Sequence, residues 1–197
     1  NKKTKYKCIE DFLKNNYPDI KSLKSGEAII DYSKDIIDES INAVKKLNSS
    51  FLLIQGPPGA GKTYTSAKII LSLIKDKKKV GINSNSHKAI NNLLLKIEEL
   101  AAEEDFKFEG FKKSSKEVDK FNGKNIRESR IELVTKNCLI YAGTAWLFSD
   151  ARLDQQLDYV FIDEAGQVSL ANSIAIATTT KNIVLIGDQM QLSQPIK

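Results

Sequence analysis

One segment has the residue types and spacing to hold a chain of phosphates. Its residues fit the pattern G-x4-G-K-[ST], beginning at Gly56 and ending at Lys62 and Thr63. Glycines let backbone N–H groups point at phosphate oxygens, and a helix that starts there adds its positive dipole end. Lys62 is predicted to bind the β- and γ-phosphates, and the Thr63 hydroxyl to ligate Mg²⁺. The predicted nucleotide-binding residues are Gly56, Pro57, Pro58, Gly59, Ala60, Gly61, Lys62, Thr63 and Tyr64.

An acidic pair, Asp163 and Glu164, follows the apolar run 159–162. A carboxylate at the end of a buried strand is what a phosphate-binding loop of this kind needs to hold hydrated magnesium, so Asp163 is predicted as a metal ligand. Glu164 is placed to orient and deprotonate an attacking water. The pair favours hydrolysis over phosphoryl transfer to a second substrate. Taken alone, it would also fit a solvated acidic turn.

These residues belong to a longer signature. Asp163-Glu164-Ala165-Gly166, followed by Gly187-Asp188-Gln189-Met190-Gln191-Leu192-Ser193-Gln194-Pro195, resembles motifs II and III of superfamily 1 helicases. The similarity covers about residues 50–197 and is to the branch of the nonsense-mediated-decay helicase and the Dna2-type enzymes. It implies a RecA-like P-loop NTPase domain with ATP and Mg²⁺ as cofactors. It also implies that Gln191 senses the γ-phosphate, which makes Lys62, Glu164 and Gln191 the candidate catalytic residues.

Two further segments are similar to the nucleic-acid motifs of that family. Ser86 and His87 stand at the position of motif Ia, and Thr144 and Trp146 at that of motif Ic. Hydroxyl groups and helix-start N–H groups can donate to backbone phosphates, and an indole can stack on a base. His87 is equally compatible with a surface role, and a lone Trp after a strand is more often part of the core. The strings NSNSHKAINNLL and YAGTAWLFS look like bacterial helicases fused to a RecB-like nuclease.

The resemblance also implies binding partners, and the chain differs from the family pattern at one point. It implies single-stranded nucleic acid, DNA in preference to RNA, and a second RecA-like domain that this chain does not contain. That second domain supplies an arginine finger worth about 10³- to 10⁵-fold in rate, so slow hydrolysis and no unwinding are expected of this chain alone. The stretch 38–43 lacks the glutamine with which the family reads adenine.

Three other classes of P-loop protein share parts of this sequence pattern. Asp163 to Gly166 fits the D-x-x-G pattern of GTPases, but the sequence contains no N-K-x-D motif to read guanine. A P-loop ATPase that remodels proteins without moving on nucleic acid is the main alternative. A remnant that only binds nucleotide is a further one, although the intact Lys62, Thr63, Asp163 and Glu164 argue against it.

Alternating apolar runs and helical stripes predict the elements that position these residues. Strands are predicted at 51–54, 79–83, 131–134, 138–142, 159–162 and 183–186, and helices at 37–47, 62–74 and 86–101. Strands that alternate with helices indicate an α/β fold with a parallel sheet and helices on both faces. Residues 1–50 are expected to form a helical N-terminal segment, and residues 51–197 the motor domain. Ligands of such sheets bind at the carboxyl ends of the strands, where all these motifs lie.

A small charged insertion is predicted at about 103–130, outside the main sheet. Its phenylalanines are interleaved with basic residues, namely Lys107, Lys112, Lys113, Lys116, Lys120, Lys124, Arg127 and Arg130. Such a segment could track a phosphate backbone and stack bases. Since charge runs are usually solvated faces, a solvated excursion whose phenylalanines pack locally is the other interpretation.

Composition indicates which partners and which cellular location are compatible with the chain. The net charge of +5 permits a phosphate-rich partner without requiring one. The two cysteines, Cys8 and Cys138, lie far apart, which indicates free thiols in a reducing compartment and predicts a cytoplasmic location. No apolar run approaches the roughly 20 residues of a membrane span, so no membrane partner is expected.

Overall fold

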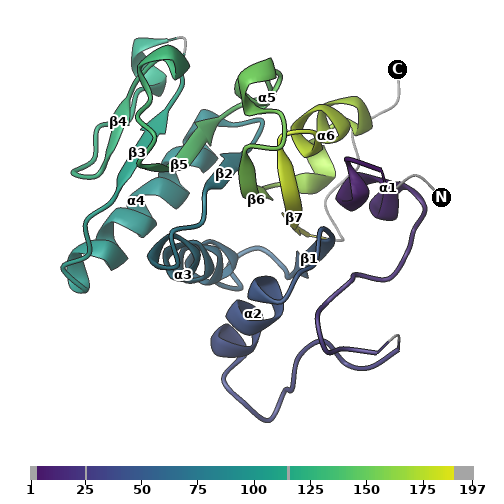
Figure 1. Ribbon diagram of the computed structural model, residues 1–197. Coiled ribbons are helices and arrows are strands. Elements are labelled where there is room, and N and C mark those ends of the chain that lie inside the picture. Colours follow the sequence, from purple (N-terminus) through teal and green to yellow (C-terminus); the bar gives the residue numbers. More distant parts are fainter. Residues whose placement is uncertain (1–3, 25, 115, 189–197) are drawn as a thin grey trace.

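The computed structural model describes residues 4–24, 26–114 and 116–188, and these build one sheet of seven parallel strands. The strand order is β1-β7-β6-β2-β5-β3-β4 (Figure 1). The strands are β1 (Phe51–Gln55), β2 (Val80–Asn83), β3 (Glu109–Lys112), β4 (Ile126–Glu128), β5 (Cys138–Gly143), β6 (Leu157–Ile162) and β7 (Thr180–Gly187). The predicted α/β fold with a parallel sheet is confirmed.

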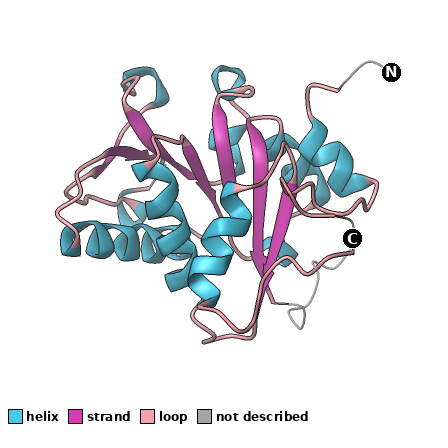
Figure 2. Ribbon diagram, turned by 60° about the horizontal axis from the view of Figure 1, so that its bottom comes forward, coloured by secondary structure: helices cyan, strands magenta, loops and turns pink. Residues whose placement is uncertain are grey.

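The central strands are largely apolar because helices cover both of their faces. All residues of β2 and β5 are buried, as are all of β6 except Asp158. A parallel sheet buried on both sides requires this continuous apolar pattern in place of alternation. Figure 2 shows the sheet between its helices.

Two groups of helices cover the two faces. The first face packs on α2 (Ile36–Lys45), α3 (Lys62–Lys75) and α4 (His87–Glu103). The second packs on α1 (Lys7–Leu13), α5 (Ala145–Phe148) and α6 (Leu170–Ala177). Short 3-10 turns complete the elements: η1 (Glu117–Asp119), η2 (Ile131–Leu133), η3 (Ala151–Leu153) and η4 (Ala165–Gln167). Helices on both faces were predicted, and their placement is confirmed (Figures 1 and 2).

Helix α4 shows why the sequence starts a helix where it does. The Ser86 hydroxyl accepts a hydrogen bond from the N–H of Ala89 at 3.3 Å, as expected of an N-cap residue. Ile90, Leu93 and Ile97 then recur on one side and are fully buried against the sheet. The helix therefore holds its first turn at a fixed place beside the carboxyl end of β2.

The charged insertion was predicted outside the main sheet, and this prediction is wrong. Its strands β3 and β4 extend the sheet beyond β5, with Gly110 paired to Ile140 and Ile126 paired to Gly110. Glu98 of α4 fixes it by accepting hydrogen bonds from the N–H groups of Asn125, at 2.8 Å, and Ile126, at 2.9 Å. Phe108 and Phe111 are buried on opposite faces of the sheet. The strand predicted at 131–134 is also wrong, because η2 occupies 131–133.

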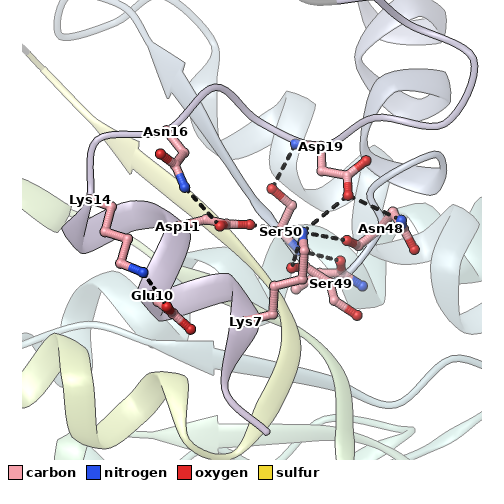
Figure 3. Close-up of polar contacts among 10 residues, drawn as sticks. Lys7, Glu10, Asp11, Lys14, Asn16, Asp19, Asn48, Ser49 and Ser50 are labelled. Atoms are coloured by element: carbon pink, nitrogen blue, oxygen red, sulfur yellow. Dashed lines mark hydrogen bonds and ion pairs between the residues drawn. The ribbon is translucent and has the colours of Figure 1, made fainter. Parts of the chain in front are cut away.

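The N-terminal segment is less helical than predicted. Of residues 4–50, only those of α1 and α2 form helices, and the chain between them runs through turns. The Lys7 ammonium binds Asp11 within α1 at 2.8 Å and Asp19 of the following loop at 3.0 Å (Figure 3). It also donates to the carbonyl oxygen of Asn48 at 3.4 Å, which joins α1 to the segment just before β1. The N–H of Asp19 donates to the Ser50 hydroxyl at 2.8 Å. This network lies at the amino ends of the strands, opposite the motifs.

Two further observations concern the chain as a whole. Cys8 and Cys138 are both buried and free, as predicted. In the part of the chain that the structure describes, no helix combines the length and apolarity that crossing a membrane requires.

Candidate functional site

The strand order brings the phosphate-binding loop and the acidic pair together. Strand β7 lies between β1 and β6, with Gln55 paired to Gly187 and Ile162 paired to Leu185. All three strands are parallel, so their carboxyl ends share one edge of the sheet. The loop after β1, Gly187 at the end of β7 and Asp163 after β6 are therefore neighbours.

The loop from Gly56 to Gly61 has the backbone that its glycines were predicted to allow. Gly59 and Gly61 both have φ of +78°, a left-handed conformation that residues with a Cβ rarely adopt. The Lys62 ammonium lies over the loop and donates to the carbonyl oxygens of Gly56 and, at 2.8 Å, Pro57. These carbonyls hold the ammonium where phosphate oxygens could replace them as partners.

The acidic pair is positioned by the neighbouring strand. The N–H of Asp163 donates to the carbonyl oxygen of Asn83 at 2.8 Å, and the N–H of Glu164 donates to the Asp163 carboxylate at 2.9 Å. Burial raises the pKa of Asp163, against the lowering effect of that N–H, and the Glu164 carboxylate adds to the rise. Glu164 has φ of 54°, in the left-handed region.

These groups line one open pocket of about 480 Å³. Its lining residues are Gly59, Gly61, Lys62, Thr63, Tyr64, Ala89, Asn92, Lys96, Asp163, Glu164, Gly187 and Asp188. The volume lies within the roughly 300–1,000 Å³ of sites that bind small molecules. A lysine, a hydroxyl and clustered carboxylates suit a triphosphate with a divalent cation, and such a cation would offset the raised pKa of Asp163. The residues present therefore fit ATP and Mg²⁺.

The structure brings most predicted nucleotide-site residues to this pocket. The pair Lys62 and Thr63 lies beside the pair Asp163 and Glu164, although about half of the chain separates the two pairs in sequence. Gln191 and the rest of the predicted motif III beyond Asp188 lie outside the described residues. Ala89, Asn92 and Lys96 of α4 were not predicted at this site. No sequence motif assigned them to the nucleotide site, and the packing of α4 beside α3 places them there.

A second, smaller hollow of about 120 Å³ gathers three of the predicted nucleic-acid residues. It is lined by His87, Lys113, Ser114, Thr144, Trp146 and Leu147. The Trp146 side chain is 82% exposed, so the interpretation of this residue as core is wrong. Ser86 does not line the hollow, and its hydroxyl serves as the N-cap of α4.

His87 is half-buried, and its environment disfavours the charged imidazolium by lowering its pKa. Burial lowers the pKa of His87, and the nearby charge of Lys112 lowers it further. The Nδ1 atom is buried and has no hydrogen-bond partner among the described residues. Neutral imidazole can donate one hydrogen bond to a phosphate but cannot pair with it as a cation.

Comparison with known proteins gives the family and its relatives. The family model described as "AAA domain" matches residues 38–196. The "DNA replication ATP-dependent helicase/nuclease dna2" of Schizosaccharomyces pombe is 26% identical over 86% of this chain. The "ATP-dependent helicase NAM7" of Saccharomyces cerevisiae is 28% identical over 99%. The chain spans only 13% and 26% of these two proteins. The resemblance to Dna2-type helicases seen in the sequence is thus confirmed.

Solved structures support the fold alone, because sequence identity to them is low. The UvsW helicase of bacteriophage T4 is 13% identical with a TM-score of 0.55, over 91% of this chain and 68% of that chain. A nuclease-deletion mutant of the restriction-modification enzyme LlaGI, solved with a DNA substrate mimic, is 18% identical with a TM-score of 0.53. That similarity covers 81% of this chain and 17% of that chain. The predicted RecA-like P-loop fold is confirmed.

Proposed function

This chain belongs to the AAA-domain family, and from that premise we propose that it is the ATP-hydrolysing motor domain of a nucleic-acid helicase. One observation carries the proposal. The Lys62 ammonium, the Thr63 hydroxyl and the carboxylates of Asp163 and Glu164 line a single pocket. This is the set of groups that binding and hydrolysis of a nucleoside triphosphate requires.

The roles of the residues follow from their chemistry. Lys62 exchanges its two carbonyl partners for β- and γ-phosphate oxygens. Thr63 and Asp163 would hold Mg²⁺, which would supply positive charge to offset the charge that develops on the phosphates. Glu164 accepts a proton from the attacking water. Gln191, the proposed γ-phosphate sensor, lies outside the described residues, and its role is carried by the family resemblance.

Single-stranded nucleic acid is the proposed track, and the hollow beside α5 is its proposed site. His87 and Thr144 offer donors to backbone phosphates, and the exposed indole of Trp146 offers a face to a base. Ser86 contributes indirectly by capping α4. DNA is favoured over RNA because relatives such as the fission-yeast protein are named DNA replication helicase/nucleases.

The proposal extends to the protein of which this domain is a part. A second RecA-like domain is its proposed partner, as the helicase relatives are much longer than this chain. The two free thiols support work in the reducing cytoplasm. The fused RecB-like nuclease remains a prediction from the sequence resemblance.

Nucleotide binding tests the proposal directly. Titration with a fluorescent ATP analogue and Mg²⁺ should show saturable binding, and Lys62→Ala should weaken it by about 10-fold or more because a charged contact is lost. Lys75→Ala is the matched control, since it removes an ammonium at the other end of α3. Equal binding by wild type and Lys62→Ala would refute the site. Nucleotide binding without any affinity for single-stranded DNA would favour an ATPase that remodels proteins.

A further inference from the structure

The insertion forms one wall of the hollow that contains Trp146. Lys113 and Ser114 follow β3 directly, and they face Thr144 and Trp146 from the start of α5. The end of β3 and α5 lie at the same end of the sheet (Figure 1). Pairing of Lys112 with Ala142 on β5 brings the two segments together. Two pieces of chain about 30 residues apart in sequence thus share one small surface.

Lys113 provides this surface with an available positive charge. Its side chain is exposed, while its N–H is fixed by a 2.9 Å hydrogen bond to the carbonyl oxygen of Ala142. No ion pair of the Lys113 ammonium occurs within the described residues. The nearby carboxylate of Asp150 is already bound by Arg152 at 2.6 Å. The ammonium can therefore take a phosphate without first breaking a salt bridge.

Hydrogen bonds of a half-buried carboxylate and a buried ammonium hold the Lys113–Ser114 segment in place from behind. The Glu128 carboxylate accepts hydrogen bonds from the N–H of Ser114 at 2.6 Å and from its hydroxyl at 2.8 Å. Lys112 is fully buried, and its ammonium donates to the carbonyl oxygen of Asp119. An ammonium is costly to bury unless it is hydrogen-bonded, as that of Lys112 is. The segment beside the hollow is therefore built to a defined shape.

We propose that the insertion completes a binding site for one nucleotide of a single strand, in which Lys113 binds a phosphate and Trp146 stacks on the adjoining base. Glu128 is a positioning residue that acts through Ser114. This inference rests on the proposed function. It favours an insertion that contacts nucleic acid over an insertion that is only a solvated excursion. The partner is a phosphodiester with an attached base, and Thr144 supplies a hydroxyl donor beside Lys113.

The size of the hollow supports this ligand. At about 120 Å³ it is much smaller than sites that enclose a whole small molecule, which measure roughly 300–1,000 Å³. It suits a ligand that continues beyond the site on both sides, as a nucleotide in a strand does. An aromatic face next to a lysine is the usual arrangement for sequence-independent binding of single strands.

Trp146 is the only tryptophan of the chain, so its fluorescence reports on this site alone. Titration of the full chain with a short oligothymidylate should quench that fluorescence. Lys113→Gln should weaken binding and reduce the slope of log affinity against log salt by about 0.7, the effect of one lost phosphate contact on a single strand. Trp146→Phe, followed by anisotropy of a labelled oligothymidylate, should preserve binding, whereas Trp146→Ala should weaken it by about 5- to 150-fold.

Lys124→Gln is the matched control, because Lys124 is an exposed lysine of the same insertion that does not line the hollow. Equal effects of Lys113→Gln and Lys124→Gln on affinity and salt slope would overturn the inference and leave the proposed function intact. A wild type that binds nucleotide but no oligothymidylate at any salt would overturn both.

The positioning role of Glu128 has its own readout. Glu128→Ala removes the acceptor of both Ser114 hydrogen bonds, whereas Glu128→Gln keeps an oxygen in the same place. Glu128→Ala should weaken oligothymidylate binding and reduce the quenching at saturation, and Glu128→Gln should restore both. Identical binding by wild type and Glu128→Ala would refute this role.

Discussion

Glu164 is the proposed base of the site, and it also has an unfavourable backbone conformation. Its φ of 54° places a non-glycine residue in the left-handed region, which costs about 1–2 kcal/mol. The fold supports this conformation through the hydrogen bond from the Glu164 N–H to the Asp163 carboxylate. Strain of this kind is concentrated at functional sites. At this position it turns the chain sharply after β6 and leaves both carboxylates in the nucleotide pocket.

Two substitutions separate the charge of Glu164 from its strain. Glu164→Gln should abolish hydrolysis because it removes the base, and it retains the backbone preference of the wild type. Glu164→Asn should also abolish hydrolysis, but it should be more stable than Glu164→Gln by up to about 1 kcal/mol, since Asn tolerates the left-handed region. For a domain of this size that is a rise in Tm of about 2–4 °C. Thermal unfolding and phosphate release measure the two effects. Hydrolysis at the wild-type rate by Glu164→Gln would show that Glu164 is not the base.

At the scale of elements, α4 links the two candidate sites. Ala89, Asn92 and Lys96 face the nucleotide pocket, while His87 in the first turn faces the hollow beside Trp146. A helix is a stiff connection between such groups. A change in nucleotide state that shifts α4 would therefore reach the nucleic-acid face directly.

The start of α4 depends on its N-cap. Ser86→Ala removes the acceptor for the N–H of Ala89 and should cost about 1 kcal/mol of folding free energy. Ser86→Gly should cost only a few tenths of a kcal/mol, because glycine is itself accepted at N-caps. Denaturant unfolding of the three proteins checks this order. If Ser86→Ala is as stable as wild type but fails to bind DNA, Ser86 is a contact residue and not a cap.

The strands that could be predicted from sequence are the most apolar ones. Strands β1, β2, β5, β6 and β7 contain continuous apolar runs, so their positions could be predicted. Strands β3 and β4 could not, because Lys112 and Arg127 interrupt short segments with charge. The ammonium of Lys112 is buried, and it donates a hydrogen bond to the carbonyl oxygen of Asp119. No local sequence pattern indicates this contact.

The same limit applies to the candidate sites. Lys62, Thr63 and Asp163 could be predicted because their motifs define both the chemistry and the strand that ends there. Lys113 could not be separated from the other lysines of the insertion, since its position depends on β3 joining the sheet beside β5. The exposure of Trp146 likewise follows from the short helix α5, which buries Leu147 and turns the indole outward.

At the scale of the whole molecule, one edge of one sheet carries both candidate sites. The nucleotide pocket lies after β1, β7 and β6, and the hollow lies after β2, β3 and β5. The net charge of +5 is modest, so affinity for nucleic acid should come from a few placed contacts and not from a strong overall field. Because α4 contributes residues to both sites, binding at the two sites should be thermodynamically linked.

The most direct test of this account measures that linkage. Affinity for a labelled single-stranded oligonucleotide is determined with and without a saturating non-hydrolysable ATP analogue and Mg²⁺, for wild type and for Lys62→Ala. The account predicts that nucleotide changes the affinity of the wild type by about 5-fold or more, in the range typical of coupled sites, and leaves that of Lys62→Ala unchanged. A wild type that binds both ligands with no effect of one on the other would contradict it.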